Sequence, residues 1–439
     1  MYRNAVWPLL AIMCVSGAAL AQLSDAALAA LQLRAKEEGW TFTVGRTLES
    51  LQPLEELCGL VVPPSGRIDA PAARSSAKAD LPDAFNWQDE VGCPPIRPQR
   101  GCGACWAFAT VGALECNILI KDGVVVDLSE QWLVSCNQET TPPVLPPNDP
   151  TPSWGCNGGW FAHDYHLGLK TDACGGFGAV FEGEFPYVQD EVPCNCPYTH
   201  AYTIDSWAFV GPEFDVADVD AIKQAIVTYG PVSAAIYADM TFSSYTGGVF
   251  NLGVTAPPNH GIVLVGWDDN LGANGAWRLR NSWYPSWGEN GYMWIEYGRS
   301  NVGFGACYID YPGVGPAVGP TITQDPSSGQ VIEGRSFVFS VEADAVGLVH
   351  YAWEHDGQPV GDDAPVLGLT DVSLDDAGSY ACYVTDFLGT SVSAGASLVV
   401  IPESAVPVSS AAIVGACIAL VLIASHRIRS AVPPLTRRR

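Results

Sequence analysis

The chain has 439 residues, among them 47 Asp and Glu against 21 Lys and Arg, so its formal net charge at pH 7 is −26. This charge argues against nucleic-acid binding, which requires a basic surface. The length predicts two or three domains, and the 14 cysteines indicate an oxidising compartment, where disulfides form and persist.

The first 21 residues are typical of an export signal. Arg3 precedes an apolar run over residues 5–20, and the small residues Ala19 and Ala21 predict cleavage before Gln22. Residues 1–21 are therefore predicted to be a signal peptide and the protein to be exported. An uncleaved membrane anchor is the alternative, which the short apolar run disfavours.

Residues 22–80 form an N-terminal extension. Residues 23–39 have the apolar spacing of an amphipathic helix, and residues 40–44 alternate as a strand does. Residues 63–78 are rich in small and helix-breaking residues and predict a linker.

A glycine-rich turn, Gly101-Cys102-Gly103, precedes an apolar run with helical spacing over residues 106–120. Cys105 is therefore predicted at a helix N-terminus, where the helix macrodipole and the free N–H groups favour an anion. The thiol of Cys105 is expected to ionise readily, and the thiolate is the nucleophilic form of cysteine.

Two further helices are predicted to begin at the N-cap residues Ser129 and Asp218. Beyond them, alternating apolar residues predict strands at 232–237, 261–267, 276–280 and 291–297. Helices followed by strands indicate an α+β fold with a helical lobe and a β lobe. The cleft between two such lobes is a natural ligand site.

Five short sequence blocks stand in this region. In chain order they are Cys102-Gly-Ala-Cys105-Trp, Ser129-Glu-Gln131, Gly155-Cys-Asn-Gly-Gly159, Asn259-His260-Gly261 and Asn281-Ser-Trp283. The blocks and their order resemble those of the papain/cathepsin family of cysteine peptidases, whose nucleophile signature the first block matches. The resemblance implies a papain-like two-lobe peptidase over residues 81–312. It also implies an inhibitory propeptide over residues 22–80, for which a plain extension is the alternative.

The same resemblance implies the roles of the catalytic residues. Cys105 would be the nucleophile and His260 the base, with Asn281 orienting the His260 ring. Gln99 would complete an oxyanion site with the backbone N–H of Cys105. Trp283 would shield the bond between His260 and Asn281 from water. No metal and no organic cofactor is implied. His163 and His166 are expected on the surface of a helix, and no further ligands stand at metal-site spacing from them.

The resemblance also places substrate-binding residues. Gly158 and Gly159 would pair with an extended substrate backbone, while Trp160 and Phe161 would form part of an apolar S2 wall, although Trp160 could instead belong to the core. Asn259 stands beside the base, where plant relatives have Asp. An apolar P2 side chain is therefore the expected preference.

Disulfides follow from the resemblance as well. It pairs Cys102 with Cys156 and Cys136 with Cys194 or Cys196. By likeness to cathepsin B-type enzymes, it pairs Cys93 with Cys116.

Residues 313–320 have the glycine and proline content of a linker, and residues 321–401 resemble an immunoglobulin-like sandwich. Tyr380 lies two residues before Cys382, as in the tyrosine corner of that fold. Val341 stands where the partner cysteine would be. We therefore expect Val341 and Trp353 to pack around a buried Cys382 thiol, without a disulfide between the sheets.

Residues 402–439 predict one C-terminal transmembrane helix with a basic tail. The run 406–425 is uncharged and apolar and reaches about 20 residues, enough to span a bilayer. Arg427 and Arg429 follow and predict that the C-terminus faces the cytoplasm. The segment resembles the sorting signals of bacterial surface proteins, which are processed, and a permanent anchor remains the alternative.

Taken together, these features predict a secreted or surface-tethered cysteine endopeptidase made as a zymogen. Its partners would be protein or peptide substrates, the membrane, and an unknown ligand of the immunoglobulin-like domain. The alternative is a surface-binding or adhesion protein with a silent peptidase fold, which would not need the intact set Cys105, His260, Asn281 and Gln99.

Overall fold

The computed structural model describes residues 23–63, 81–138, 154–314 and 319–405. It divides into two compact units, Met1–Val318 with Val346–Leu348, and the rest of the chain from Gly319. The predicted signal peptide and the run 406–425 lie outside the described residues. Within the part that is described, no helix has the length and apolar character needed to cross a bilayer.

The first unit combines helices with one large sheet. Its α-helices are α1 (Asp25–Glu38), α2 (Leu54–Leu57), α3 (Trp87–Glu90), α4 (Cys105–Asp122), α5 (Glu130–Cys136), α6 (His163–Leu167), α7 (Val219–Tyr229) and α8 (Met240–Ser243). Its strands are β1 (Phe42–Val44), β2 (Ala84–Asn86), β3 (Ala179–Val180), β4 (His200–Tyr202), β5 (Ser206–Phe209), β6 (Val232–Ile236), β7 (Tyr245–Phe250), β8 (His260–Asp268), β9 (Ala276–Arg280), β10 (Tyr292–Glu296) and β11 (Phe304–Asp310).

The large sheet runs in the order β1-β7-β10-β9-β8-β6-β11-β5, and β2 pairs with β8. Neighbouring strands are antiparallel except β7 and β10. Strand β8 is buried along almost its whole length, between β6 and β9. It therefore holds its first residue, His260, in a fixed position.

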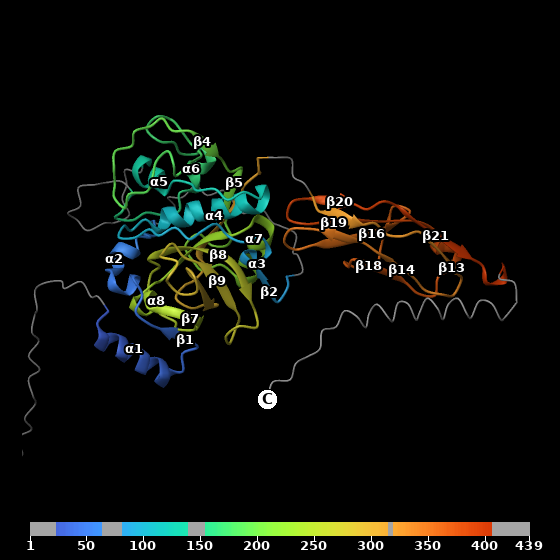
Figure 1. The fold of residues 1–439 in the computed structure, drawn as a ribbon, viewed down its shortest axis with the longest axis horizontal. Coiled ribbons are helices and arrows are strands. Elements are labelled where there is room, and N and C mark those ends of the chain that lie inside the picture. The colour runs from blue at the N-terminus through green and yellow to red at the C-terminus, as the bar shows by residue number, and fades with distance from the viewer. Residues whose placement is uncertain (1–22, 64–80, 139–153, 315–318, 406–439) are drawn as a thin grey trace, which may run out of the picture. The chain divides into compact units, whose positions relative to one another are not determined.

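Helix α4 is the central helix of this unit. It lies between the lobe of α5, α6 and β4 and the sheet that contains β8 and β9 (Figure 1). Most of its side chains are buried on all sides, so it forms part of the core and does not lie on the surface. It ends at Gly123, whose φ of 67° is the left-handed conformation that commonly closes a helix.

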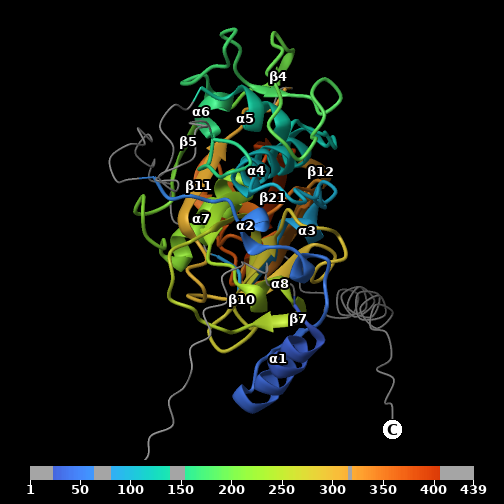
Figure 2. The same ribbon diagram turned by 90° about the vertical axis from the view of Figure 1, so that its left-hand side faces the viewer.

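The N-terminal segment, residues 23–63, lies against the sheet lobe. Helix α1 begins at Ser24, whose side chain accepts the Ala27 N–H, and none of its residues is buried. Strand β1 pairs antiparallel with β7, and Figure 2 shows α1 beside that edge. Phe42 of β1 is buried against Phe250, with ring centroids 4.4 Å apart.

Helix α6 differs from expectation. His163 and His166 are fully buried and not on the surface. Their rings pack among aromatic side chains, His163 against Trp207 at 5.7 Å and His166 against Trp132 at 6.3 Å between centroids. Burial lowers the pKa of each to about 3, because the charged imidazolium is not stabilised away from water.

The second unit is made of β-strands. They are β12 (Thr321–Gln324), β13 (Gly329–Ile332), β14 (Phe337–Ser340), β15 (Glu342–Asp344), β16 (His350–His355), β17 (Gln358–Val360), β18 (Val366–Leu369), β19 (Gly378–Thr385), β20 (Thr390–Val392) and β21 (Ala396–Ile401). The largest sheet has the order β13-β21-β19-β16-β17, with β20 paired to β19, and β14 pairs with β18.

The core of this unit contains Val341, Trp353, Tyr380 and Cys382, all buried. Cys382 is a free thiol. The Tyr380 hydroxyl donates to the Asp376 carbonyl at 2.9 Å, which fixes the start of β19.

Candidate active site

Cys105 is the first residue of α4 and is fully buried. The backbone N–H of Gly59, from the N-terminal segment, donates to its Sγ at 3.3 Å. Burial raises the pKa of the Cys105 thiol to about 11, although the backbone groups of Gly261 and Gly59 act in the opposite direction. Burial therefore outweighs the N–H groups near the thiol, and the expected lowering of its pKa does not occur.

His260 and Asn281 lie on neighbouring strands, at the start of β8 and just after β9. The ring Nε2 of His260 and the Asn281 Oδ1 are 2.8 Å apart and both side chains are buried. Trp283 covers this pair, with its ring centroid 4.8 Å from that of His260. Burial lowers the pKa of His260 to about 4, against the opposing effect of the Asn281 hydrogen bond.

Gln99 is fully buried in the loop that precedes α4. Its Nε2 donates to the carbonyl oxygens of Leu57 at 3.1 Å and Cys102 at 3.0 Å. Its Oε1 accepts the Ser282 hydroxyl at 2.7 Å, and its backbone N–H donates to the Ser282 carbonyl at 2.8 Å. Ser282 was not among the predicted site residues, although it stands between Asn281 and Trp283 in a block that was.

The N-terminal segment crosses the site as an extended strand. Gly159 donates to the Gly59 carbonyl and accepts from Val61, each at 2.9 Å, which makes a parallel bridge opposite Leu60. The Leu60 N–H donates to the Asn259 carbonyl at 3.0 Å. The predicted substrate edge at Gly159 is thus occupied by the chain's own backbone.

Two glycines allow this close approach. A Cβ at Gly59 would lie 1.8 Å from the Gly103 carbonyl oxygen. Gly158 has a φ of 120°, and a Cβ there would lie 2.7 Å from the Gly59 carbonyl oxygen. A side chain at either position would therefore displace the segment from the site.

Three other residues predicted to bind substrate are buried or have their polar groups bonded within the protein. Trp160 and Phe161 are both buried, with ring centroids 4.8 Å apart. The Asn259 side-chain amide accepts a hydrogen bond from the Ala238 N–H at 2.8 Å and donates one to the Ala238 carbonyl at 2.9 Å. Its polar atoms therefore fix the segment around Ala238 and do not face a ligand.

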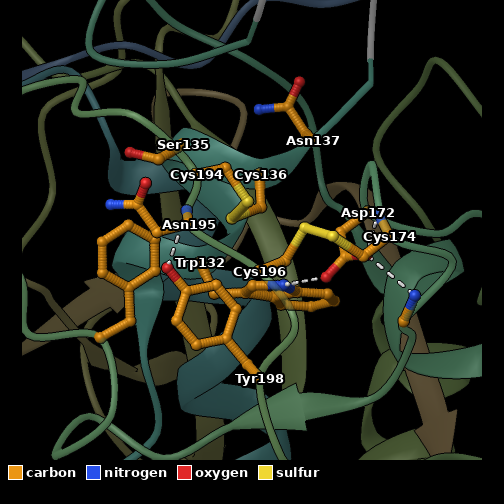
Figure 3. Close-up of a disulfide and its surroundings, with 12 residues drawn as sticks. Trp132, Ser135, Cys136, Asn137, Asp172, Cys174, Cys194, Asn195, Cys196 and Tyr198 are labelled. Atoms are coloured by element: carbon orange, nitrogen blue, oxygen red, sulfur yellow. Dashed lines mark hydrogen bonds between the residues drawn. A yellow bond between two sulfur atoms is a disulfide. The ribbon is translucent and has the colours of Figure 1, made fainter.

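Three disulfides occur among the described residues, Cys102–Cys156, Cys136–Cys194 and Cys174–Cys196. The first joins the loop before α4 to the segment that leads into Gly158 and Gly159, and so it fixes that edge next to the start of α4. Figure 3 shows the other two side by side near Trp132. The bond from Cys174 to Cys196 was not expected.

Cys93 and Cys116 do not form the expected disulfide. Both are free thiols. They share a hydrogen bond, which lowers the pKa of Cys93 to about 7 and raises that of Cys116, with Arg280 close to both.

Comparison with known proteins shows the family of this chain. The family model for papain family cysteine proteases matches residues 81–314, just over half of the chain. The chain belongs to the papain family of cysteine peptidases. It is 32% identical to human cathepsin L2 over 242 residues, which are 54% of this chain and 66% of the relative. It is 31% identical to rat cathepsin S over 245 residues, 54% of this chain and 68% of the relative.

Solved structures show the same fold. The proform of the ragweed pollen allergen Amb a 11, a cysteine protease, aligns with a TM-score of 0.53 at 24% identity, covering 64% of this chain and 85% of that one. The recombinant stem bromelain precursor aligns with a TM-score of 0.52 at 21% identity, covering 65% and 89%. The expected papain-like α+β fold is thereby confirmed. The chain spans about two thirds or less of the first curated relatives it matches.

Proposed function

We propose that this chain is an exported cysteine endopeptidase, made as a zymogen, that hydrolyses peptide bonds through Cys105, His260 and Asn281. The observation that carries the proposal is the buried hydrogen bond between His260 and Asn281 beside the helix that begins at Cys105. Such an arrangement supplies a nucleophile, a base and a group that orients the base.

The reaction follows from these positions. Cys105 attacks the scissile carbonyl after His260 takes its proton, and His260 then protonates the leaving amine. The Gln99 amide and the Cys105 N–H stabilise the oxyanion, and one such donor contributes roughly 3–4 kcal/mol. Water, deprotonated by His260, hydrolyses the thioester.

In this proposal, residues 22–80 are an inhibitory propeptide. The Leu57 carbonyl accepts the hydrogen bond of the Gln99 amide that would otherwise serve the oxyanion. The Gly59 N–H donates to the Cys105 thiol. With the pKa of Cys105 at about 11 and that of His260 at about 4, both groups are neutral at pH 7, so the reactive ion pair is not formed until the segment leaves.

An apolar P2 side chain is the proposed preference. Leu60 of the N-terminal segment is buried opposite Gly159, so an apolar side chain already fits beside that edge. Substrates with Leu at P2 should be cleaved faster than otherwise identical substrates with Asp at P2.

The experiment that tests the activity uses a thiol-directed epoxide label and a peptide substrate on the protein freed of residues 22–80. Wild type should be labelled and active, and Cys105→Ala should be neither. Cys307→Ala removes another buried free thiol and should retain both properties. Full activity of Cys105→Ala would overturn the proposal, and an inactive, unlabelled wild type would favour the adhesion alternative.

The remainder of the chain is proposed to tether the enzyme. The hydrogen bond from Tyr380 to Asp376 and the buried Trp353 support an immunoglobulin-like domain. The apolar run 406–425 supports a membrane anchor. Truncation before Val406 should release the enzyme into the medium, and a truncated protein found only in the membrane fraction would contradict this.

A further inference from the structure

Cys58 is a free cysteine to which the proposed function gives no role. It follows α2 and directly precedes Gly59, which covers the catalytic thiol. Its side chain is partly exposed, whereas Cys105 is fully buried. The question is whether its position allows it to react with Cys105.

The backbone on both sides of Cys58 is fixed at the active site. The Leu57 carbonyl accepts from the Gln99 amide at 3.1 Å. The Gly59 N–H donates to the Cys105 Sγ at 3.3 Å. Cys58 is thus held between two residues that both contact the catalytic groups.

Covalent geometry limits the distance between the two cysteines. The Cα of Cys58 lies about 2.4 Å from the Gly59 nitrogen, because they are separated by two bonds. Adding the 3.3 Å hydrogen bond places this Cα within about 5.7 Å of the Cys105 Sγ. Across a disulfide the distance from one Cα to the partner's Sγ is at most about 4.5 Å, so even the longest separation requires a shift of only about 1.2 Å.

Electrostatics agree with this proximity. Burial raises the pKa of the Cys58 thiol well above its usual value, and the neighbouring Cys105 raises it further. The negative charges of Asp239 and Glu55 act in the same direction. Cys105 is thus close enough to Cys58 to oppose the ionisation of its thiol.

We propose that Cys58 and Cys105 form a disulfide that locks the N-terminal segment onto the active site until a reductant opens it. This inference rests on the proposed function, in which Cys105 is the nucleophile and residues 22–80 are the propeptide. The bond would make latency covalent in the oxidising compartment that the composition indicates.

The chemistry needs a low-molecular-weight disulfide as oxidant, for example oxidised glutathione. Cys58, the more accessible thiol, attacks it as the thiolate, forms a mixed disulfide and expels one thiol. The Cys105 thiolate then attacks the Cys58 sulfur and expels the second. The two cysteines lose two protons and two electrons, and the oxidant becomes two thiols. An added dithiol reverses both steps.

The first test is peptide mapping of the full chain after incubation with oxidised glutathione at pH 8 and removal of the excess. Under non-reducing conditions, wild type and Cys307→Ala should both yield a peptide that joins Cys58 to Cys105. Cys58→Ser should not. Separate peptides carrying a free or glutathione-bound Cys58 and Cys105 in the wild type would overturn the proposal.

The second test measures release. A site for a specific protease, inserted between Ser75 and Ser76, allows the segment to be cut from the peptidase. After oxidation and cutting, wild type should show no epoxide labelling of Cys105 until a dithiol is added, whereas Cys58→Ser should be labelled without one. Equal labelling of both proteins before reduction would refute the lock.

The mapping does not depend on peptidase activity. A chain that forms the bond but hydrolyses no peptide, even after reduction and removal of residues 22–80, would refute the proposed function alone. An active enzyme that never forms the bond would refute the lock alone.

Discussion

At the scale of single residues, burial raises the pKa of Cys105 and lowers that of His260. Sequence reasoning placed Cys105 at a helix N-terminus, and the structure does so. The expected effect on the thiol did not follow, because its burial outweighs the favourable N–H groups, that of Gly59 among them. The burial of Cys105 involves a residue distant in sequence, Gly59, and no local motif indicates that contact.

The hydrogen bond from Ser282 to Gln99 leads to a prediction about catalysis. Ser282→Ala leaves the Gln99 Oε1 without its 2.7 Å partner, so the amide that we propose as an oxyanion donor can rotate. Since loss of a whole oxyanion donor costs about 10²–10³-fold, loss of its orientation should lower kcat roughly tenfold with little change in KM.

Steady-state kinetics on the processed enzyme provide the measurement. Ser286→Ala, an exposed serine in the turn that follows Trp283, is the matched control and should keep the wild-type kcat. A Ser282→Ala enzyme with unchanged kcat would show that Gln99 is held by other contacts.

At the scale of elements, the strongly periodic segments were predictable. The helices that begin after Ser129 and Asp218 form as α5 and α7, and each of these residues caps its helix through its side chain. The pairing of β1 with β7 could not be predicted, because the two strands lie about 200 residues apart and β1 has only three residues. Short strands carry too little pattern to select a partner.

This pairing gives a prediction about inhibition by the N-terminal segment. Phe42 is 4% exposed and packs on Phe250 and Tyr245. Phe42→Ala should cost about 3 kcal/mol of docking energy, which corresponds to roughly 100-fold weaker inhibition. The measurement is the inhibition constant of a peptide of residues 23–63 against the processed enzyme.

Leu33→Ala in the same peptide is the control, because Leu33 lies on the outer face of α1 and is 58% exposed. It should inhibit as the unchanged peptide does. Equal inhibition by the Phe42→Ala peptide would mean that the residues at the active site, and not β1, supply the affinity.

At the scale of the whole molecule, the domain boundary that composition places at residues 313–320 stays a prediction. The glycine- and proline-rich residues 313–320 contain the division at Val318 and Gly319. The burial of His163 and His166 was not predictable, since α6 has only five residues and carries no readable periodicity. Their environment is set by Trp132 and Trp207, which come from other parts of the chain.

The two buried histidines predict that the protein becomes less stable at acid pH. Each has a pKa of about 3 when folded, below the ordinary 6.5, so folding favours the neutral ring. Their stabilisation is complete above pH 6.5 and is lost as the pH falls towards 3. At pH 5 the loss of unfolding free energy relative to pH 7 is about 2 kcal/mol per histidine.

Urea unfolding followed by tryptophan fluorescence should show His166→Gln losing about 2 kcal/mol less than wild type between these pH values. His350→Gln, at an exposed site in the second unit, should lose as much as wild type. If His166→Gln and wild type lose the same free energy of unfolding between pH 7 and pH 5, protonation of groups other than His166 causes the acid sensitivity.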